Sequence, residues 1–414
     1  MIHIAPGSVN GCLQANSSKS HMQRVVLAAS MAIGETRIQR QGKSADDRTC
    51  IEAVKMLGAK VEQSGNILKI RSGSIGRIDT IDCGESGFCL RALAAIAALK
   101  DWSIKLVGNG SLASRPISMI HGPLVQLGAK CVIDDNVAAV TVHGPLVGGR
   151  ATVNGAISSQ FLSGLLLALP RTCEDSELFV TELCSKPYVR MTLDTMASFG
   201  VQVKANKEFN KFVICGNQNY YAIDTVIEGD WSGASFMLVA GAIAGEVTVA
   251  GLNRDSAQAD RAILNVLESS GAEFQWNNQG LTVFKSNLRS FEFDATDCPD
   301  LFPPLVVLAC CAKGTSRISG VMRLIHKESN RGAVLASVFS AIGAQIKVCG
   351  AAMEIVGGPL YGGIVDSNND HRIAMACAVA GLTTRYGISI INGGCVVKSY
   401  PDFFHALQYI RGRS

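Results

Sequence analysis

The chain has 414 residues, with 38 lysines and arginines against 34 aspartates and glutamates, for a formal net charge of +4. This near balance disfavours a dedicated nucleic-acid binder, because such proteins usually carry a strong basic excess. Hydrophobic residues make up 48% of the chain, and no apolar run reaches the roughly 18 residues of a membrane helix. The start, MIHIAPGSVN, also lacks the basic and apolar regions of a signal peptide. We therefore expect a cytoplasmic protein that binds neither nucleic acid nor membrane.

The 14 cysteines form no C-x-x-C pair and no cluster with zinc-like spacing. Many lie within apolar runs, among them Cys89, Cys310 and Cys377. In a reducing compartment such cysteines behave as small hydrophobic residues. We therefore expect core cysteines and no metal site.

One pattern recurs six times along the chain, about every 70 residues. Each copy opens with a polar segment that continues into an apolar helix rich in small residues, as in residues 17–34, SSKSHMQRVVLAASMAIG. The other such segments begin at Gly84, Ile157, Gly229, Cys298 and Asn369. Helices that are apolar on nearly every side belong inside a core, so we expect their polar starts to face a cleft.

A short β-branched segment follows each apolar helix and predicts a strand. In chain order these segments read TRIQR, SIKLVG, ELFV, EVTVAG, SRISG and ISIING. An amphipathic helix comes next, and five of these end in a glycine that suits a left-handed cap, namely Gly58, Gly128, Gly200, Gly271 and Gly343. Two short strands complete each copy except the last, whose helix FFHALQYIRG runs into the C-terminus. Residues 1–6 are the candidate for its missing strand pairing.

The repeat reads β-α-β-α-β-β and predicts an α/β protein with two lobes of three copies each. We place the crossings near residues 15–17 and 226–229. One lobe then comprises residues 17–227, and the other joins residues 1–16 to residues 228–414. The second lobe is thus expected to be discontinuous and closed by the N-terminal strand, with the active site in the cleft between the lobes.

Cations recur at the predicted helix starts: Lys19, Arg24, Arg115, Lys327, Arg331, Arg372 and Lys398. Free backbone N–H groups and the helix dipole favour anions there, and cations gathered in one cleft would repel one another without polyanionic ligands. Taken singly, each of these segments could be an ordinary helix start. Ser159 or Asp300 could then be a helix cap, and Arg115 could be a surface residue. Together they indicate an anion site in which Asp300 and Glu328 could carry protons.

These motifs resemble those of the 5-enolpyruvylshikimate-3-phosphate synthase family, in family order and along nearly the whole chain. The matching segments are SKS at 18–20 with Arg24, RPI at 115–117, SSQFL at 158–162, SKPY at 185–188, EGD at 228–230, PD at 299–300, KE..R at 327–331, NDHR at 369–372 and K.YPD at 398–402. The resemblance implies a two-lobed inside-out α/β barrel. It also implies transfer of the enolpyruvyl group of phosphoenolpyruvate to the 5-hydroxyl of shikimate 3-phosphate, through a tetrahedral intermediate that loses phosphate. This step belongs to the shikimate pathway towards chorismate and aromatic amino acids. Small molecules would be the partners, with no cofactor, and we expect a monomer.

The resemblance further implies roles for the matched residues. Shikimate 3-phosphate would contact Lys19, Ser20, Arg24, Ser158, Ser159, Gln160, Ser185, Tyr188, Asp300 and Lys327. Phosphoenolpyruvate would contact Lys19, Gly87, Arg115, Gln160, Arg331, Arg372 and Lys398. The catalytic groups would be Asp300, which accepts the 5-hydroxyl proton, Glu328 as the second proton carrier, Lys19, and His371 close by.

Three segments depart from the family pattern. Asn16-Ser17 replaces the usual Pro-Gly before SKS, and Ser329-Asn330 replaces Thr-Asp before Arg331. Glu85-Ser86-Gly87-Phe88 replaces Asn-Ala-Gly-Thr in a loop that touches the phosphoenolpyruvate site in the family. A carboxylate and a bulky ring at this place bear on the affinity for phosphoenolpyruvate and on the response to glyphosate-like inhibitors.

Three other functions would also account for part of these sequence features. UDP-N-acetylglucosamine enolpyruvyl transferases have the same fold and reaction type, but they usually carry an AKN start and a cysteine on the loop before RP, where this chain has SKS and GNGSLASRP. RNA 3′-phosphate cyclases resemble single copies of the repeat, but the small net charge and absent aromatic platform disfavour RNA. The last is a catalytically impaired anion-binding homologue. Asp300 and Glu328 argue against it, and Glu85 and Phe88 leave it open.

Overall fold

The structure is a computed structural model that describes residues 1–73, 76–156 and 159–412. The chain divides into two compact units: unit 1 is Met1–Ser18 with Glu228–Ser414, and unit 2 is Lys19–Ile227. The first crossing follows residue 18, whereas the sequence placed it after residue 16. The reason is that Ser17 forms a β-bridge with Gly229, and the Ser18 N–H donates to the Glu228 carbonyl at 2.8 Å.

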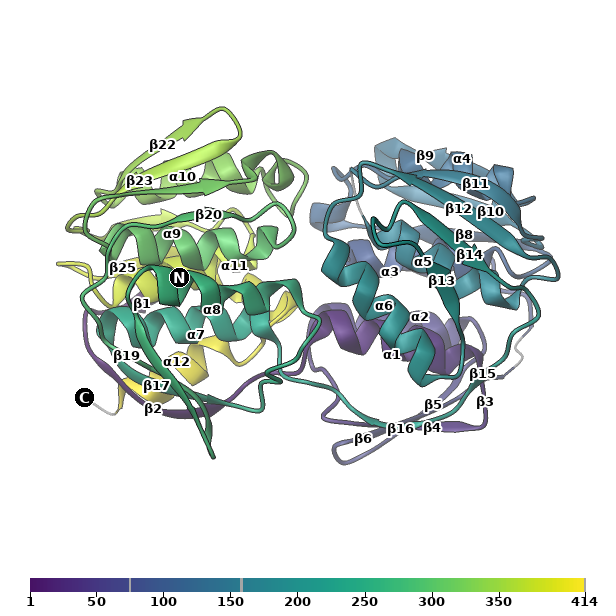
Figure 1. The fold of residues 1–414 in the computed structure, drawn as a ribbon, viewed down its shortest axis with the longest axis horizontal. Coiled ribbons are helices and arrows are strands. Elements are labelled where there is room, and N and C mark those ends of the chain that lie inside the picture. The colour runs from purple at the N-terminus through teal and green to yellow at the C-terminus, as the bar shows by residue number, and fades with distance from the viewer. Residues whose placement is uncertain (74–75, 157–158, 413–414) are drawn as a thin grey trace. The chain divides into compact units, whose positions relative to one another are not determined.

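Each four-stranded sheet of unit 2 joins one parallel pair of strands to two antiparallel strands (Figure 1). In order across each sheet, the strands are β16 (Asp224–Val226), β4 (Glu35–Gln39), β6 (Ile67–Arg71) and β5 (Lys60–Ser64); β7 (Thr80–Asp82), β8 (Ser103–Val107), β10 (Ala139–His143) and β9 (Lys130–Asp134); and β11 (Gly149–Asn154), β12 (Ser176–Thr181), β14 (Lys211–Ile214) and β13 (Val203–Ala205). A small further sheet pairs β3 (Ala32–Ile33) with β15 (Tyr220–Tyr221). The same pairing thus recurs with the period of the sequence.

The helices of unit 2 alternate between buried and amphipathic, as the sequence pattern predicts. The buried set is α1 (Lys19–Met31), α3 (Gly87–Ala97) and α5 (Ser159–Ala168), and the amphipathic set is α2 (Ala45–Met56), α4 (His121–Gln126) and α6 (Lys186–Ser198). Helix α3 packs against both α5 and α1, and every residue of α3 is buried. Short 3-10 helices are η1 (Gly110–Leu112), η2 (Ser118–Ile120), η3 (Asp135–Val137) and η4 (Leu169–Arg171).

Unit 1 repeats this plan, but two of its strands come from the N-terminus of the chain and pair with strands that are distant in sequence. The purple strand β2 (Val9–Gln14) pairs in parallel with the green strand β17 (Gly245–Ala250), and β1 (Ile2–Ile4) pairs antiparallel with β25 (Ile388–Ile391) (Figure 1). The remaining strands are β18 (Glu273–Asn277), β19 (Gly280–Phe284), β20 (Glu292–Asp294), β21 (Thr315–Ser319), β22 (Gln345–Cys349), β23 (Ala352–Val356) and β24 (Gly363–Asp366). Unit 1 is therefore discontinuous in sequence.

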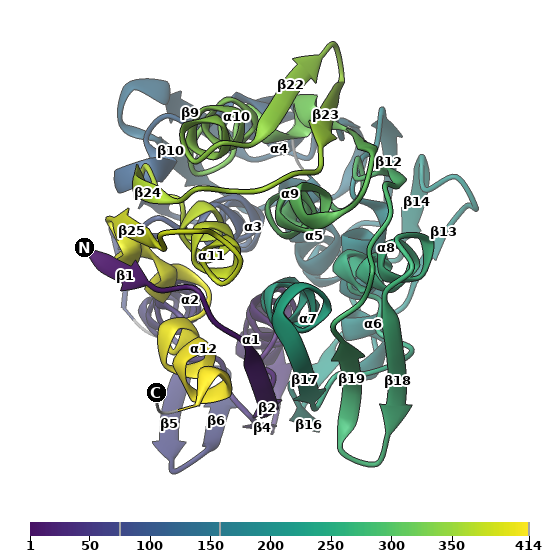
Figure 2. The same cartoon turned by 90° about the vertical axis from the view of Figure 1, so that its left-hand side faces the viewer.

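Helices α7 (Trp231–Ala244), α9 (Phe302–Cys311) and α11 (His371–Gly381) pack against one another at the centre of unit 1 (Figure 2). Their Ala- and Val-rich sequences suit close packing, and α7 and α11 are buried along their full length. Around them lie α8 (Ile263–Ser269), α10 (Arg331–Ala341) and α12 (Phe403–Arg411). The 3-10 helices are η5 (Ala259–Ala262), η6 (Pro299–Leu301), η7 (Val321–Leu324) and η8 (Gly393–Lys398).

Most of the predicted local signals are confirmed. The five glycines expected to end amphipathic helices have φ values from +76° to +109°, a backbone conformation that glycine adopts without strain. Cys89, Cys310 and Cys377 are buried. The core prediction is wrong for Cys12, Cys173 and Cys215, which are exposed because they lie on an outer strand or in turns. Among the described residues, the helices are too short or too polar to cross a membrane.

Candidate active site

Arg24, on α1, is the centre of a buried polar cluster in unit 2, and only 2% of its surface is exposed. Its Nε donates to Thr192 Oγ1 at 2.8 Å, and its Nη1 donates to the Ser20 carbonyl at 2.7 Å. Its Nη2 donates to Ser163 Oγ at 3.4 Å and to the Tyr188 carbonyl at 3.1 Å. Burial lowers the pKa of Arg24 to about 10. The guanidinium therefore stays charged at neutral pH while all these acceptors are uncharged.

Two aromatic rings flank the same guanidinium. The Phe88 ring centroid lies 4.5 Å from Arg24 Cζ, and the Tyr188 centroid lies 5.9 Å from it. Cations in such positions are attracted to the ring faces. The structure thus brings together Ser20, Arg24 and Tyr188, which the sequence had assigned to one substrate. It also explains the bulky residue at position 88 as a packing partner of this arginine.

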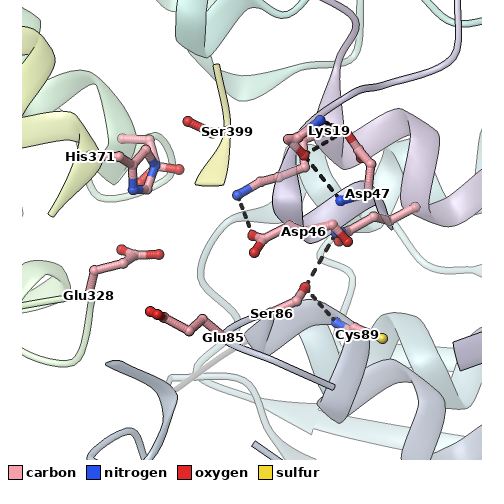
Figure 3. Close-up of polar contacts among 12 residues, drawn as sticks. Lys19, Asp46, Asp47, Glu85, Ser86, Cys89, Glu328, His371 and Ser399 are labelled. Carbon is pink, nitrogen blue, oxygen red and sulfur yellow. Dashed lines mark hydrogen bonds and ion pairs between the residues drawn. The ribbon is translucent and has the colours of Figure 1, made fainter. Parts of the chain in front are cut away.

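Lys19 is the first residue of α1 and forms an ion pair that the sequence did not reveal. Its Nζ lies 2.8 Å from Asp46 Oδ2, at the start of α2 (Figure 3). Gln23 Nε2 donates to the Asp46 carbonyl at 2.9 Å and to Ser86 Oγ at 3.3 Å. Ser86 in turn accepts the Cys89 N–H and so caps α3 (Figure 3). This chain of contacts fixes the starts of three helices relative to one another within unit 2.

Gly87 lies where two arginines approach the backbone. A Cβ atom there would come within 2.8 Å of Arg91 Nη1 and 3.1 Å of Arg115 Nη1, so a larger residue would push the ends of these two side chains aside. Arg91 donates to Gln160 Oε1 and to the Pro116 carbonyl, both at 2.7 Å. Sequence reasoning missed Arg91, although an arginine inside the otherwise apolar helix 87–97 was a usable signal. Arg91 thus lies between two of the predicted residues, Gly87 and Gln160.

Two predicted serines occupy helix starts in unit 2. Ser159 is the first residue of α5, and Ser185 holds the N-cap position of α6 with φ of +59°. Both are buried, with exposures of 6% and 5%. Ser158 lies outside the described residues. Buried hydroxyls at helix starts, beside free backbone N–H groups, suit the binding of a phosphate.

Asp300, in η6, is surrounded by cations in unit 1. Its Oδ1 lies 2.8 Å from Arg331 Nη1 and 3.5 Å from Lys327 Nζ, and its Oδ2 lies 3.0 Å from Arg372 Nη2. Burial alone would raise the pKa of Asp300, but Arg372, Lys327 and Arg331 together hold that pKa well below its ordinary value. The carboxylate is therefore ionised at neutral pH and able to accept a proton.

Arg331, the first residue of α10, is completely buried among carboxylates. Besides Asp300, its Nη2 contacts Glu328 Oε2 at 2.6 Å and its Nε contacts Asp370 Oδ2 at 2.9 Å. Ser329 Oγ also donates to Asp370 Oδ2, at 3.0 Å. Burial would lower the pKa of Arg331, but the three carboxylates raise it above its usual range. Arg331 thus binds together the groups that the sequence assigned to proton transfer.

Glu328, Asp370 and His371 each place a ligand atom within 4.8 Å of the others, a grouping that could hold a metal ion. The guanidinium of Arg331 already donates to the carboxylates of Glu328 and Asp370, so it supplies the positive charge that these two groups face. His371 is 1% exposed and its Nδ1 lies 3.9 Å from Asp370 Oδ1. The arrangement fits an ion-pair network.

Arg372 and Lys327 complete the cation set around Asp300. Arg372 is 4% exposed, and its Nε and Nη1 have no hydrogen-bond partner among the described residues. Buried donors without partners are costly, so these N–H groups suit an anionic ligand. Burial lowers the pKa of Lys327 to about 8, although Asp300 opposes this shift.

The prediction that every cation lies at a helix start is correct in part. Lys19, Arg331 and Arg372 lie in first helical turns. Arg115 lies in the turn between η1 and η2, ahead of α4, and Lys398 ends η8, ahead of α12, so each precedes an amphipathic helix without lying in its first turn. Pro116 directly follows Arg115, and a residue before proline avoids helical backbone angles, which keeps Arg115 outside the helix.

Residues 4–407 match the family model of EPSP synthase (3-phosphoshikimate 1-carboxyvinyltransferase). The 3-phosphoshikimate 1-carboxyvinyltransferase of Clostridium novyi (strain NT) is 36% identical over 424 residues, covering 99% of this chain and 97% of the relative. That of Methanocorpusculum labreanum is 36% identical over 412 residues, covering 98% and 97%. These similarities span both units.

Solved structures share the architecture. The EPSP synthase of Acinetobacter baumannii superposes with a TM-score of 0.83 at 24% identity, over 99% of this chain and 97% of that chain. The enolpyruvyl transferase NikO from Streptomyces tendae gives a TM-score of 0.80 at 16% identity, over 99% and 96%. At these identities the likeness establishes the fold.

Proposed function

The chain belongs to the EPSP synthase family, and on this premise we propose how its residues transfer the enolpyruvyl group of phosphoenolpyruvate to the 5-hydroxyl of shikimate 3-phosphate. The transfer is a step of the shikimate pathway, on the way to the aromatic amino acids. Both substrates are small polyanions, so catalysis depends on positioning, charge stabilisation and the movement of two protons.

In the addition step, the 5-oxygen forms a bond to the enol carbon of phosphoenolpyruvate. The hydroxyl proton passes to Asp300, and the methylene carbon gains a proton and becomes a methyl group. Glu328 and Lys19 serve as proton carriers for this carbon. In the elimination step, the methyl group loses a proton and the C–O bond to phosphate breaks, which leaves the enolpyruvyl ether and free phosphate.

Shikimate 3-phosphate is assigned mainly to residues of unit 2. Arg24 binds the ring carboxylate, with Ser20 and Tyr188 beside it. The 3-phosphate is held by the hydroxyls at the helix starts, Ser158, Ser159 and Ser185, with Lys327 for its charge, and Gln160 lies against the ring. The buried positions of Ser159 and Ser185 support this assignment.

Phosphoenolpyruvate is assigned to the remaining cations. Lys19, Arg115 and Lys398 take its phosphate, and Arg331 and Arg372 take its carboxylate. Gly87 allows Arg115 to approach the backbone, and Gln160 is held by Arg91. The unpartnered Nε and Nη1 of Arg372 support its part in this assignment.

The observation that carries the catalytic assignment is the contact of Asp300 with Arg331, Arg372 and Lys327 at 2.8, 3.0 and 3.5 Å. These cations keep the carboxylate ionised, but they also make it a weak base. Anionic substrates that bind the same cations offset their charge and so raise the basicity of Asp300. His371 is buried beside this network, with its Nδ1 3.9 Å from Asp370 Oδ1.

A phosphate-release assay tests the proposal directly. We expect release only when phosphoenolpyruvate and shikimate 3-phosphate are both present, and none when UDP-N-acetylglucosamine replaces shikimate 3-phosphate. Release with the nucleotide sugar would instead support the related UDP-N-acetylglucosamine transferase activity. If no phosphate is released with either acceptor, the result would support the catalytically impaired homologue.

Asp300→Ala tests the proton acceptor. We expect kcat to fall at least about 100-fold, because a positioned acid or base contributes roughly 10²–10⁴-fold. Asp255→Ala, which removes an exposed carboxylate from the same unit, is the matched control and should keep normal turnover. Near-normal kcat for Asp300→Ala would rule out the role.

We also propose a cytoplasmic monomer. The buried, unpatterned cysteines support a reducing compartment. Size-exclusion chromatography with light scattering tests the oligomeric state, and a mass near 43.7 kDa is expected.

A further inference from the structure

The loop that departs from the family pattern carries Glu85, whose carboxylate is directed at Ser111 in η1. Glu85 Oε2 accepts the Ser111 O–H at 2.6 Å and the Ser111 N–H at 3.2 Å. A Cβ atom on Gly110 would lie 2.5 Å from the same carboxylate, so the glycine lets the two segments close up. Glu85 therefore packs on the segment that leads to Arg115.

A second pair of contacts joins the same two segments. Asp82 Oδ1 accepts the Gly84 N–H at 2.8 Å and Asn109 Nδ2 at 3.3 Å. The Asn109 N–H also donates to the Gly84 carbonyl at 2.9 Å. The loop of residues 82–87 is thus tied to the segment of residues 109–111 by side chains and backbone together.

These hydrogen bonds are connected to Arg115 through the residues on either side of it. The Arg115 N–H donates to the Leu112 carbonyl at 3.0 Å, which links Arg115 directly to η1. At the other end, Arg91 Nη2 holds the Pro116 carbonyl at 2.7 Å. The segment of residues 111–116 is therefore fixed at both ends, by Glu85 and by Arg91. Between those ends, Arg115 Nη1 packs over Gly87.

We propose that Glu85 is a positioning residue, which holds Arg115 in place for the phosphate of phosphoenolpyruvate by anchoring Ser111. The proposal rests on the proposed function, because it uses the assignment of Arg115 to that phosphate. A carboxylate in this loop would repel phosphoenolpyruvate if it faced the substrate. Its contacts with Ser111 give it a different effect, which is to order the segment that carries the cation.

Steady-state kinetics of four variants test the proposal. Glu85→Ala should raise KM for phosphoenolpyruvate about tenfold, with kcat and KM for shikimate 3-phosphate within about twofold, since a misplaced binding group loses affinity for its own ligand. Glu85→Gln should rescue most of this loss, because its amide oxygen still accepts from Ser111. Ser111→Ala should raise the same KM about threefold. The double variant Glu85→Ala/Ser111→Ala should be no worse than Glu85→Ala alone, since the two groups act as one contact.

Opposite outcomes separate positioning from simple repulsion. If Glu85 repels the substrate, both Glu85→Ala and Glu85→Gln lower KM for phosphoenolpyruvate, and the proposal is overturned. Equal changes in both KM values, or additive effects in the double variant, overturn it as well. Glu52→Ala removes another exposed carboxylate of unit 2 and should leave every constant unchanged.

Hydrogen–deuterium exchange keeps the proposal testable without turnover. In Glu85→Ala the amides of residues 109–115 should exchange faster, whereas those of residues 19–31 should not, and Glu85→Gln should resemble the wild type. Unchanged exchange in residues 109–115 would contradict the anchoring role. If the wild-type enzyme released no phosphate, the proposed function would be wrong. The exchange measurement would still show whether Glu85 anchors Ser111.

Discussion

Two buried arginines, one in each unit, are stabilised in opposite ways. Arg24 donates to hydroxyls and carbonyls, and burial lowers its pKa to about 10. Arg331 donates to the carboxylates of Asp300, Glu328 and Asp370, which raise its pKa despite burial. Within the described part of the chain, no carboxylate contacts Arg24 to offset its positive charge, while Arg331 belongs to a nearly balanced ion-pair network.

The difference separates two uses of the same side chain. An arginine held by uncharged acceptors remains attractive to a ligand anion, and it is costly to bury until that anion arrives. An arginine held by carboxylates organises those carboxylates and attracts a further anion less strongly, so Arg331 contributes less than Arg372 to the binding of the phosphoenolpyruvate carboxylate. We therefore expect Arg24 to matter most for substrate affinity and Arg331 to matter most for the integrity of unit 1.

Arg331→Met should give the largest effect on stability. It leaves Asp300, Glu328 and Asp370 close together without their shared cation, and removal of one partner from a buried ion pair typically costs about 3–5 kcal/mol. Urea unfolding measures the loss. Arg331→Lys keeps the charge and should lose less, although it cannot reproduce the forked contacts. A loss for Arg331→Met below about 1 kcal/mol would show that the network does not depend on this arginine.

Arg24→Met should destabilise the protein less, by about 1–2 kcal/mol, because unsatisfied buried acceptors cost energy while the cost of burying a charge disappears. Its KM for shikimate 3-phosphate should rise far more than its KM for phosphoenolpyruvate. The measurements are urea unfolding and steady-state kinetics with each substrate varied in turn. A stability loss equal to that of Arg331→Met would remove the contrast between the two arginines.

The smallest effect is a pH dependence that comes from Lys327. Its pKa of about 8 is lower than the pKa of about 10 of Arg24, so only Lys327 loses its charge near neutral pH. Burial lowers the pKa of Lys327 to about 8, so this cation is charged below pH 8 and neutral above it. KM for shikimate 3-phosphate should therefore be flat at lower pH and rise up to about tenfold per unit above pH 8, since one pKa unit is 1.36 kcal/mol. Lys327→Arg stays charged and should abolish the rise. A flat profile in the wild type up to pH 9.5 would contradict this.

Local structure was largely predictable, because the repeat imposes it. The strands SIKLVG and EVTVAG and the glycine ends of the amphipathic helices follow from side-chain alternation and from the backbone freedom of glycine. The crossing after Ser18 was placed slightly early, because a β-bridge from Ser17 to Gly229 leaves no mark in the local sequence.

The polar partners of the site were not predictable in the same way. Asp46 is 27 residues from Lys19, and Thr192 is 168 residues from Arg24. Nothing in the sequence near either cation identifies these partners. The role of Phe88 likewise became visible only when its ring was found 4.5 Å from Arg24 Cζ.

The sequence by itself determined the repeat, the alternation of buried and amphipathic helices, and the identity of the charged residues at the motifs. Periodicity and glycine placement act over a few neighbours, so the chain records them directly. The tertiary structure alone decided which cation meets a carboxylate and which meets only hydroxyls and carbonyls. Such pairing depends on contacts between distant segments and on burial, and these two conditions set the charge that each residue offers to a substrate.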